Sequence, residues 1–285
     1  MADLAKPAPE TSLTQMAHAN VPKPGECPAT LHAEPFPYGW IDSYLPQDIY
    51  DALERSFVMP DLHPGLDTLK KGKKRVSFRM PPVPDTLAGL DPVWRDYLSA
   101  LASREFLAHC LEWTRQLMPL DSLPEGPYRE LFRLRQALTP DQVELQCEFS
   151  SIEGGALLPP HSDSTDKLLI FVHYFAQEQW VEGWGGATEI YSPPKPAQRV
   201  NFSNFFLPRD QVDLIGSSAF RPNRLFFFAK NDRAWHGVSA LSPESNLPRR
   251  SFNFSLRIRA DAKIDPAIEG LQARIRTQEQ QAFPA

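Results

Sequence analysis

The stretch LPPHSDSTDKLLIFVHYF, residues 158–175, is the part of the sequence that decides the fold and the chemistry. It places His161 and Asp163 two positions apart, directly before an apolar run typical of a buried strand. In an extended segment, residues i and i+2 point to the same side, so both side chains can reach one metal ion. Imidazole and carboxylate are the donors of the facial set that binds non-haem iron(II), which needs a second histidine from elsewhere.

The candidate for that second histidine is His236 in DRAWHGVSAL, which follows a strongly strand-like run. A His-x-Asp motif alone is weak evidence, because seven histidines in 285 residues often produce one by chance. The specificity of the pattern must therefore come from its surroundings.

Those surroundings are a series of short strand-like runs separated by Gly, Pro, Asn and Asp clusters. They are LFRLRQAL (131–138), VELQCEFSSI (143–152), KLLIFVHYF (167–175), GATEIYS (186–192), RLFFFAK (224–230) and RRSFNFSLRIR (249–259). No helix long enough for a parallel crossover lies between them, so the pattern favours an antiparallel barrel or a double-sheet jelly roll. We expect a mainly β protein with flanking helices, of the α+β class.

Segments with helical periodicity precede and follow the strand-like runs. The periodicity is carried by Ile49, Leu53 and Phe57, by apolar residues over 91–120, and by Ile264, Ile268, Leu271 and Ile275 behind a proline in the first turn. We expect a single domain over 36–285, with helical support over about 36–130, the strand core over about 131–260 and a C-terminal helix over 261–285. Residues 1–35, rich in Pro, Ala and Thr, are expected to form a mobile tail.

The order of these features resembles the prolyl-4-hydroxylase-like branch of the iron(II)- and 2-oxoglutarate-dependent oxygenases. The resemblance covers roughly 145–259, from the His-x-Asp motif through WGGATE (184–189) and HGV (236–238) to RRS (249–251), with a weaker likeness in WIDSYLPQDIYDAL (40–53). It implies a double-stranded β-helix, or jelly-roll, core. It also implies metal ligands at His161, Asp163 and His236, with no catalytic residue beyond them.

The same resemblance implies a basic residue on a strand after His236. This residue binds the carboxylate of 2-oxoglutarate that lies far from the metal. Both Arg249 and Arg250 are available, and strand alternation favours Arg249 because it shares a face with Ser251. A guanidinium offers the bidentate fork that a carboxylate prefers. Tyr174 matches a tyrosine that hydrogen-bonds the same carboxylate in this branch.

The implied activity is that of an oxidoreductase, a dioxygenase that uses Fe(II), 2-oxoglutarate and dioxygen to hydroxylate its substrate. Asp163 is informative here, because related halogenases vacate the carboxylate position for chloride. A small molecule is the favoured substrate: an amino acid, a sugar or glycan precursor, or a natural product. The alternatives are a peptidyl hydroxylase of the prolyl type and a catalytically silent β-barrel binding module.

Two residues are candidates for substrate contact: Lys167, where relatives often place a basic residue, and Trp235, beside a proposed ligand. Two segments are expected to frame the entrance. One is the charged run LKKGKKRVSFRM (69–80), which is predicted as a loop or hairpin, and the other is the long insertion over 192–220.

The overall composition limits which binding partners and which cellular compartment are expected for this protein. A formal net charge of −5 and a pI near 5.8 provide no extended basic track, which disfavours nucleic acid; the KKGKKR cluster is the one feature in its favour. Three widely spaced cysteines form neither a disulfide framework nor a zinc site. With no signal peptide and no apolar run of membrane-spanning length, we expect a cytoplasmic protein without a membrane partner. The sequence does not address the oligomeric state.

Overall fold

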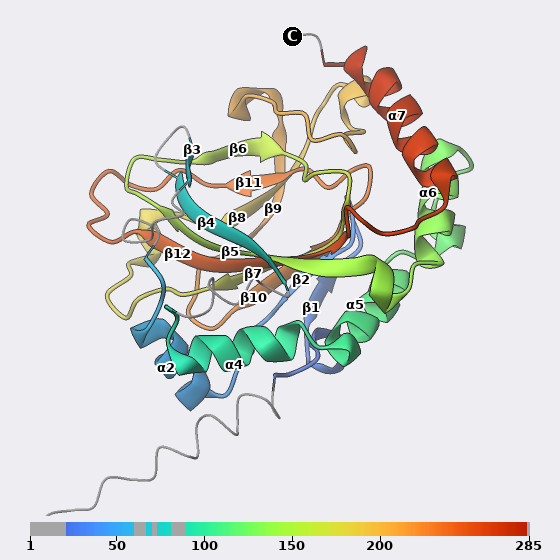
Figure 1. Ribbon diagram of the computed structural model, residues 1–285. Coiled ribbons are helices and arrows are strands. Elements are labelled where there is room, and N and C mark those ends of the chain that lie inside the picture. Colours follow the sequence, from blue (N-terminus) through green and yellow to red (C-terminus); the bar gives the residue numbers. More distant parts are fainter. Residues whose placement is uncertain (1–20, 60–66, 70–72, 81–88, 284–285) are drawn as a thin grey trace, which may run out of the picture.

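The computed structural model describes residues 21–59, 67–69, 73–80 and 89–283, and these form two antiparallel sheets with helices packed around them (Figure 1). The large sheet has the strand order β1-β2-β10-β7-β12-β5-β4-β3. Its strands are β1 (Thr30–His32), β2 (Tyr38–Ile41), β3 (Asp67–Leu69), β4 (Lys73–Met80), β5 (Val143–Ile152), β7 (Lys167–Tyr174), β10 (Leu225–Ala229) and β12 (Arg249–Ile258).

The small sheet lies over one face of the large sheet, with the order β6-β11-β8-β9 (Figure 1). Its strands are β6 (Leu158–His161), β8 (Thr188–Ser192), β9 (Asp213–Ser218) and β11 (His236–Val238). The mainly β prediction with flanking helices and antiparallel pairing is therefore confirmed.

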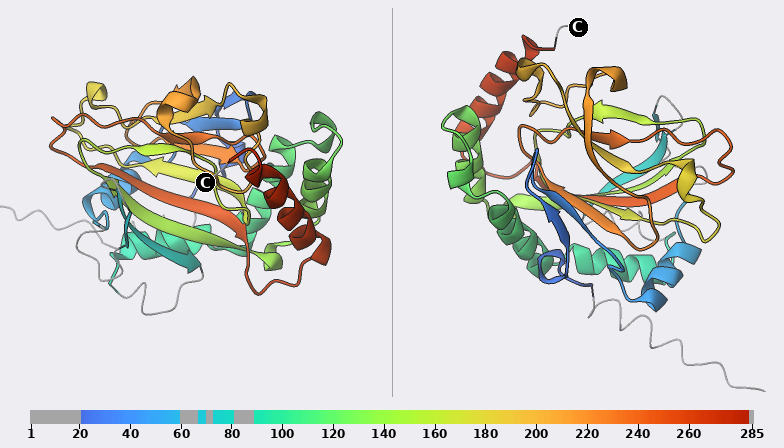
Figure 2. Two further views of the ribbon diagram at one scale, coloured as in Figure 1. Left: turned by 90° about the horizontal axis from the view of Figure 1, so that it is seen from above. Right: turned by 180° about the vertical axis from the view of Figure 1, so that it is seen from behind.

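The helices cover the other face of the large sheet or its end. They are α2 (Gln47–Arg55), α4 (Pro92–Leu101), α5 (Arg104–Leu117), α6 (Pro127–Gln136) and α7 (Pro266–Gln280). Helices α4 and α5 begin at side-chain N-caps, where Asp91 accepts from Val93 N and Ser103 accepts from Phe106 N. Figures 1 and 2 show α6 and α7 side by side at one end of the sheets.

Strand alternation separates the two faces of the large sheet. On β12, Phe252 and Leu256 are fully buried in the cluster that packs on the helices. Trp94 of α4 illustrates this packing, because its ring lies 5.1 Å from that of Phe252 and its Nε1 donates to Leu53 O at 3.1 Å. The alternate residues of the strand, such as Asn253, face the small sheet and line a cavity between the two sheets.

One predicted strand is a helix. Residues 131–136 of this run lie in α6. Pro127 starts the helix, the apolar residues Leu131 and Phe132 are buried on one of its faces, and Arg133 pairs with Glu130 at i,i+3 on the exposed face. The alternation of Leu and Arg in LFRLRQAL satisfies a strand period and a helical period equally well.

The expected N-terminal tail and helical support also need correction. Residues 1–20 lie outside the described residues, but β1, which falls in the expected tail, pairs with β2, and Cys27 packs against the main core. Strands β2 and β4 fall inside the expected helical interval and belong to the large sheet. The charged run over 69–80 is a hairpin strand pair in its described part, as predicted.

The C-terminal helix α7 lies where the periodicity predicted it, with Pro266 in its first turn behind the N-cap Asp265. The insertion over 192–220 is partly ordered, since it supplies β9 to the small sheet. Among the residues described, no helix combines the length and apolar character needed to cross a bilayer.

Candidate metal centre

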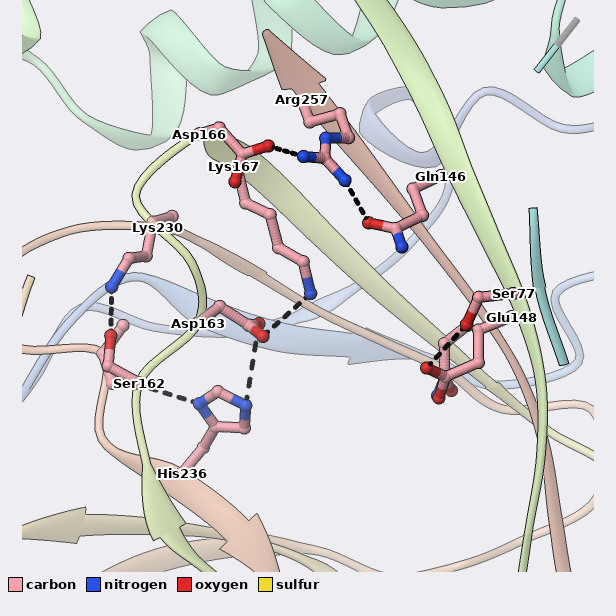
Figure 3. Close-up of polar contacts among 12 residues, drawn as sticks. Ser77, Gln146, Glu148, Ser162, Asp163, Asp166, Lys167, Lys230, His236 and Arg257 are labelled. Carbon is pink, nitrogen blue, oxygen red and sulfur yellow. Dashed lines mark hydrogen bonds and ion pairs between the residues drawn. The ribbon is translucent and has the colours of Figure 1, made fainter. Parts of the chain in front are cut away.

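Three side chains with metal-binding atoms meet where the small sheet faces the cavity. His161 ends β6, Asp163 follows it in the loop, and His236 begins β11 directly opposite His161 in the antiparallel register. One ligand atom from each lies within 4.8 Å of the other two. Figure 3 shows His236 and Asp163 pointing toward one another. The pairing of β6 with β11 thus brings His161 and His236 together, although they lie far apart in the sequence.

The two histidines are oriented by the same kind of contact. Nδ1 of His161 lies 3.0 Å from Pro159 O, and Nδ1 of His236 lies 2.9 Å from Ala234 O. Because a carbonyl oxygen only accepts, each Nδ1 must carry the proton, which leaves each Nε2 with a lone pair. A backbone carbonyl in this position is a common outer-shell partner of a metal-binding histidine.

Asp163 is held in its charged form. Although burial alone raises the pKa of a carboxyl group, Lys167 and the two histidines hold the pKa of Asp163 well below its ordinary value. Lys167 Nζ donates to Oδ1 at 2.8 Å, and Oδ2 lies 3.8 Å from His236 Nε2. Burial lowers the pKa of His236, which favours the neutral ring needed for metal coordination.

This donor set fits a divalent transition metal. Two neutral imidazoles and one carboxylate make a facial triad, which leaves positions open on an octahedral ion. Both histidines are buried, and Asp163 is partly buried.

The cavity in front of the triad has a volume of about 400 Å³ and lies between the two sheets. Its small-sheet side carries the three residues of the triad. Its large-sheet side is formed by inward-facing residues of β4, β5, β7 and β12. A volume of this size suits small-molecule ligands.

Arg249 lies at this cavity with 2% of its surface exposed. Its Nε donates to Gly186 O at 2.6 Å, and its terminal nitrogens approach Ser251 Oγ at 3.3 Å and Thr188 Oγ1 at 3.4 Å. Within the described part of the chain, no carboxylate forms an ion pair with this guanidinium. Burial lowers the pKa of Arg249, as expected for a cation without an anionic partner.

Arg250 lies on the opposite face of β12. It forms an ion pair with Glu54 of α2, and its guanidinium stands over the ring of Phe57 at 5.3 Å. The structure therefore places Arg249 and Ser251 at the cavity and Arg250 on the helical side, as strand alternation predicts.

Tyr174 is fully buried beside Arg249, with the guanidinium 5.1 Å from its ring centre. Its hydroxyl donates to Thr188 Oγ1 at 2.6 Å, so Thr188 links the tyrosine to the arginine. Sequence reasoning did not single out Thr188, because a threonine at the start of a strand is ordinary.

The two candidate substrate residues behave differently. Lys167 lines the cavity and pairs with Asp163. Trp235 does not line it: the residue is 1% exposed, and its Nε1 donates to Gln198 O and Arg199 O, both at 3.1 Å. The prediction of a substrate contact for Trp235 is therefore corrected to packing beneath the insertion.

The insertion contributes an aromatic side chain that sequence reasoning missed. The ring of Phe206 is stacked on that of His161, with ring centres 5.1 Å apart and an angle of 7° between the ring planes. The two residues also form an isolated β-bridge, and Phe206 is 54% exposed. Phe206 therefore stands at the mouth of the cavity, in a segment whose sequence suggested only an entrance loop.

Comparison with known proteins finds only distant structural likeness. No protein-family model and no curated protein matches the chain. Similar solved structures include a Pseudomonas putida prolyl-4-hydroxylase, at 16% identity and a TM-score of 0.42, with 78% of this chain and 93% of that chain covered.

Two further similar structures bind quite different molecules. A prolyl hydroxylase from Trichoplax adhaerens in complex with a hypoxia inducible factor peptide fragment has 10% identity and a TM-score of 0.47, with 93% and 94% covered. HygX from Streptomyces hygroscopicus, with nickel, 2-oxoglutarate and hygromycin B bound, has 12% identity and a TM-score of 0.39, with 78% and 83% covered. At TM-scores below 0.5, these likenesses do not assign a function to this chain.

Proposed function

We propose that this protein is an iron(II)- and 2-oxoglutarate-dependent dioxygenase that hydroxylates a small molecule, on a double-stranded β-helix core made by the two sheets. The observation that carries the proposal is one cavity with two complementary features. A His-Asp-His group lies on its small-sheet side, and a buried arginine without a carboxylate partner in the described chain lies at the same cavity.

The arginine accounts for the cosubstrate. A buried guanidinium is costly unless an anion pairs with it, and a bidentate carboxylate fits its fork. Arg249 would bind the far carboxylate of 2-oxoglutarate, with Ser251 and Thr188 as neighbouring hydroxyl donors. Tyr174 holds Thr188 in place through its hydroxyl.

The triad accounts for the metal. His161, Asp163 and His236 would hold iron(II), which, when bound with 2-oxoglutarate and dioxygen, supplies an oxidant that hydroxylates a C–H bond as 2-oxoglutarate is converted to succinate and carbon dioxide. The carbonyl partners of both histidines fix the rings so that each Nε2 faces the metal position. Asp163 supplies the negative charge, and Lys167 keeps that carboxylate oriented.

The size of the cavity favours a small-molecule substrate over a peptide. About 400 Å³ must accommodate both the cosubstrate and the reacting part of the substrate. The polar residues along its large-sheet wall suit a hydrophilic compound better than an apolar one.

Succinate release tests this proposal. The protein would be incubated with Fe(II), dioxygen and 2-oxoglutarate against a panel of amino acids, nucleotide sugars and proline-containing peptides. We expect succinate formation that one small-molecule class stimulates and that His161→Ala abolishes. Formation of succinate at equal rates by wild type and His161→Ala would contradict the metal assignment, and stimulation by peptides alone would contradict the substrate size.

A further inference from the structure

The wall of the cavity on the large sheet carries an ion pair that the proposed metal and cosubstrate sites do not use. Glu148 lies in the middle of β5, paired in register with Asn253 of β12 on one side and Ser77 of β4 on the other. Arg75 of β4 lies opposite Ser150, two residues further along β5. Arg75, Glu148, Ser150 and Asn253 all line the cavity, and we call these four residues the polar subsite.

Glu148 is held in a fixed orientation. Its Oε1 accepts from Asn253 Nδ2 at 2.9 Å, and its Oε2 accepts from Arg75 Nη1 at 3.3 Å and from Ser77 Oγ at 3.4 Å. The Glu148 side chain is 14% exposed and that of Arg75 is 33% exposed. Figure 3 shows Glu148 with Ser77, in the same view as Asp163 and His236.

Two acceptor atoms beside the Arg75–Glu148 ion pair have no hydrogen-bond partner among the described residues. They are Asn253 Oδ1 and Ser150 Oγ, both buried. Buried polar atoms usually form hydrogen bonds, so two such atoms without a partner in a cavity wall indicate groups that bind a ligand. An asparagine oxygen can only accept, and a ligand that satisfies it must therefore bring an N–H or O–H donor.

We propose that the polar subsite binds the head group of a small zwitterion, a molecule with an ammonium and a carboxylate on the same carbon, as in a free α-amino acid. This inference rests on the proposed oxygenase function and names its substrate class. The three N–H donors of the ammonium match three acceptors, Glu148, Asn253 Oδ1 and Ser150 Oγ. The carboxylate of the ligand pairs with Arg75, which is the more exposed member of the ion pair and can turn toward it.

The opposite charges of the subsite discriminate among small molecules. A half-buried Arg–Glu pair contributes little to stability by itself, because the cost of desolvation offsets the attraction between the two charges. A zwitterion replaces that contact with two complementary ones. An amine without a carboxylate would lack the contact with Arg75, a carboxylic acid without an amine would lack the contacts with Glu148, Asn253 and Ser150, and a neutral sugar would form neither charged contact.

The test uses the full chain with Fe(II), 2-oxoglutarate and dioxygen, and the twenty common L-amino acids as probes. Each amino acid that stimulates succinate release is then compared with its decarboxylated amine and with its deaminated acid. The variants are Glu148→Gln and Arg75→Gln, which keep the size of each side chain approximately and remove its charge. Asp141→Asn is the matched control, because it removes the partner of Arg104 in an exposed ion pair away from the cavity.

We expect at least one amino acid to stimulate succinate release about 10-fold or more, and neither of its analogues to replace it. Each of the two variants should raise KM for that amino acid by about 10-fold or more, since each loses a charge-assisted hydrogen bond. Calorimetric affinity for 2-oxoglutarate and the melting temperature should stay near wild type, and Asp141→Asn should behave as wild type throughout.

Three results would overturn the inference. They are stimulation by sugars or N-blocked peptides with none by free amino acids, no stimulation by any amino acid although the metal and 2-oxoglutarate bind, and an unchanged KM in both variants. A wild-type protein that binds no 2-oxoglutarate in the presence of the metal would instead contradict the proposed function on which the inference rests.

Discussion

Replacing Arg249 by methionine should separate cosubstrate binding from folding. Arg249 is 2% exposed, and its guanidinium has no carboxylate partner among the described residues, so a bound carboxylate would form a buried ion pair with it. Removing one partner of a buried pair costs about 3–5 kcal/mol, because the other charge is left uncompensated. Even the lower value raises the Kd for 2-oxoglutarate by on the order of 100-fold.

Arg250→Met is the matched control on the same strand. Arg250 pairs with Glu54 on the helical side, so its loss should lower the free energy of unfolding by about 1 kcal/mol and leave the affinity for 2-oxoglutarate within about twofold. Anaerobic calorimetry with Fe(II) and 2-oxoglutarate measures both variants. If Arg250→Met weakens binding and Arg249→Met does not, the assignment from strand alternation is wrong.

Three further predictions concern the histidines and the strand that carries His236. Burial lowers the pKa of His173 to about 3, so below pH 6.5 the unfolded chain takes up a proton that the native protein does not, and stability falls as the pH falls. When the pH is lowered from 7.5 to 5.5, the free energy of unfolding in urea should fall by about 1.4 kcal/mol more for wild type than for His173→Gln. If the difference in unfolding free energy between the two proteins is the same at both pH values, His173 is not a buried neutral ring. Gly237→Ala would place a Cβ 2.6 Å from Leu158 O in the pairing of β6 with β11, so it should cost about 1–3 kcal/mol and weaken metal binding, whereas Gly183→Ala, with nothing within 4 Å, should be neutral in both measurements. Manganese(II) at 100 times its Kd should raise the free energy of unfolding by about 2.7 kcal/mol in wild type and not in His161→Ala, and an equal gain in both would place the ion elsewhere.

The sequence predicts the elements that follow a clear periodicity. The strand run after His161, the helices over 91–120 and the C-terminal helix are all present, because their apolar faces repeat with the period of their own secondary structure. For residues 131–138 the pattern of Leu and Arg fits both a strand and a helix, and only the burial of the adjacent Leu131 and Phe132 decides for a helix.

The polar subsite could not be recognised in the same way. In VELQCEFSSI the alternation shows that Gln146 and Glu148 share a face, but it does not distinguish a face that lines a cavity from one that meets solvent. That distinction depends on the small sheet, which covers this face from elsewhere in the chain. The position of Trp235 depends in the same way on the insertion packed around it.

The most direct test of the central claim is the visible absorption of the protein with Fe(II) under anaerobic conditions as 2-oxoglutarate is added. We predict a weak charge-transfer band for wild type, which His161→Ala loses and which Arg249→Met shows only at much higher 2-oxoglutarate concentration. A wild type without the band, or a band unchanged in His161→Ala, would contradict the assignment of His161, Asp163 and His236 as the iron ligands.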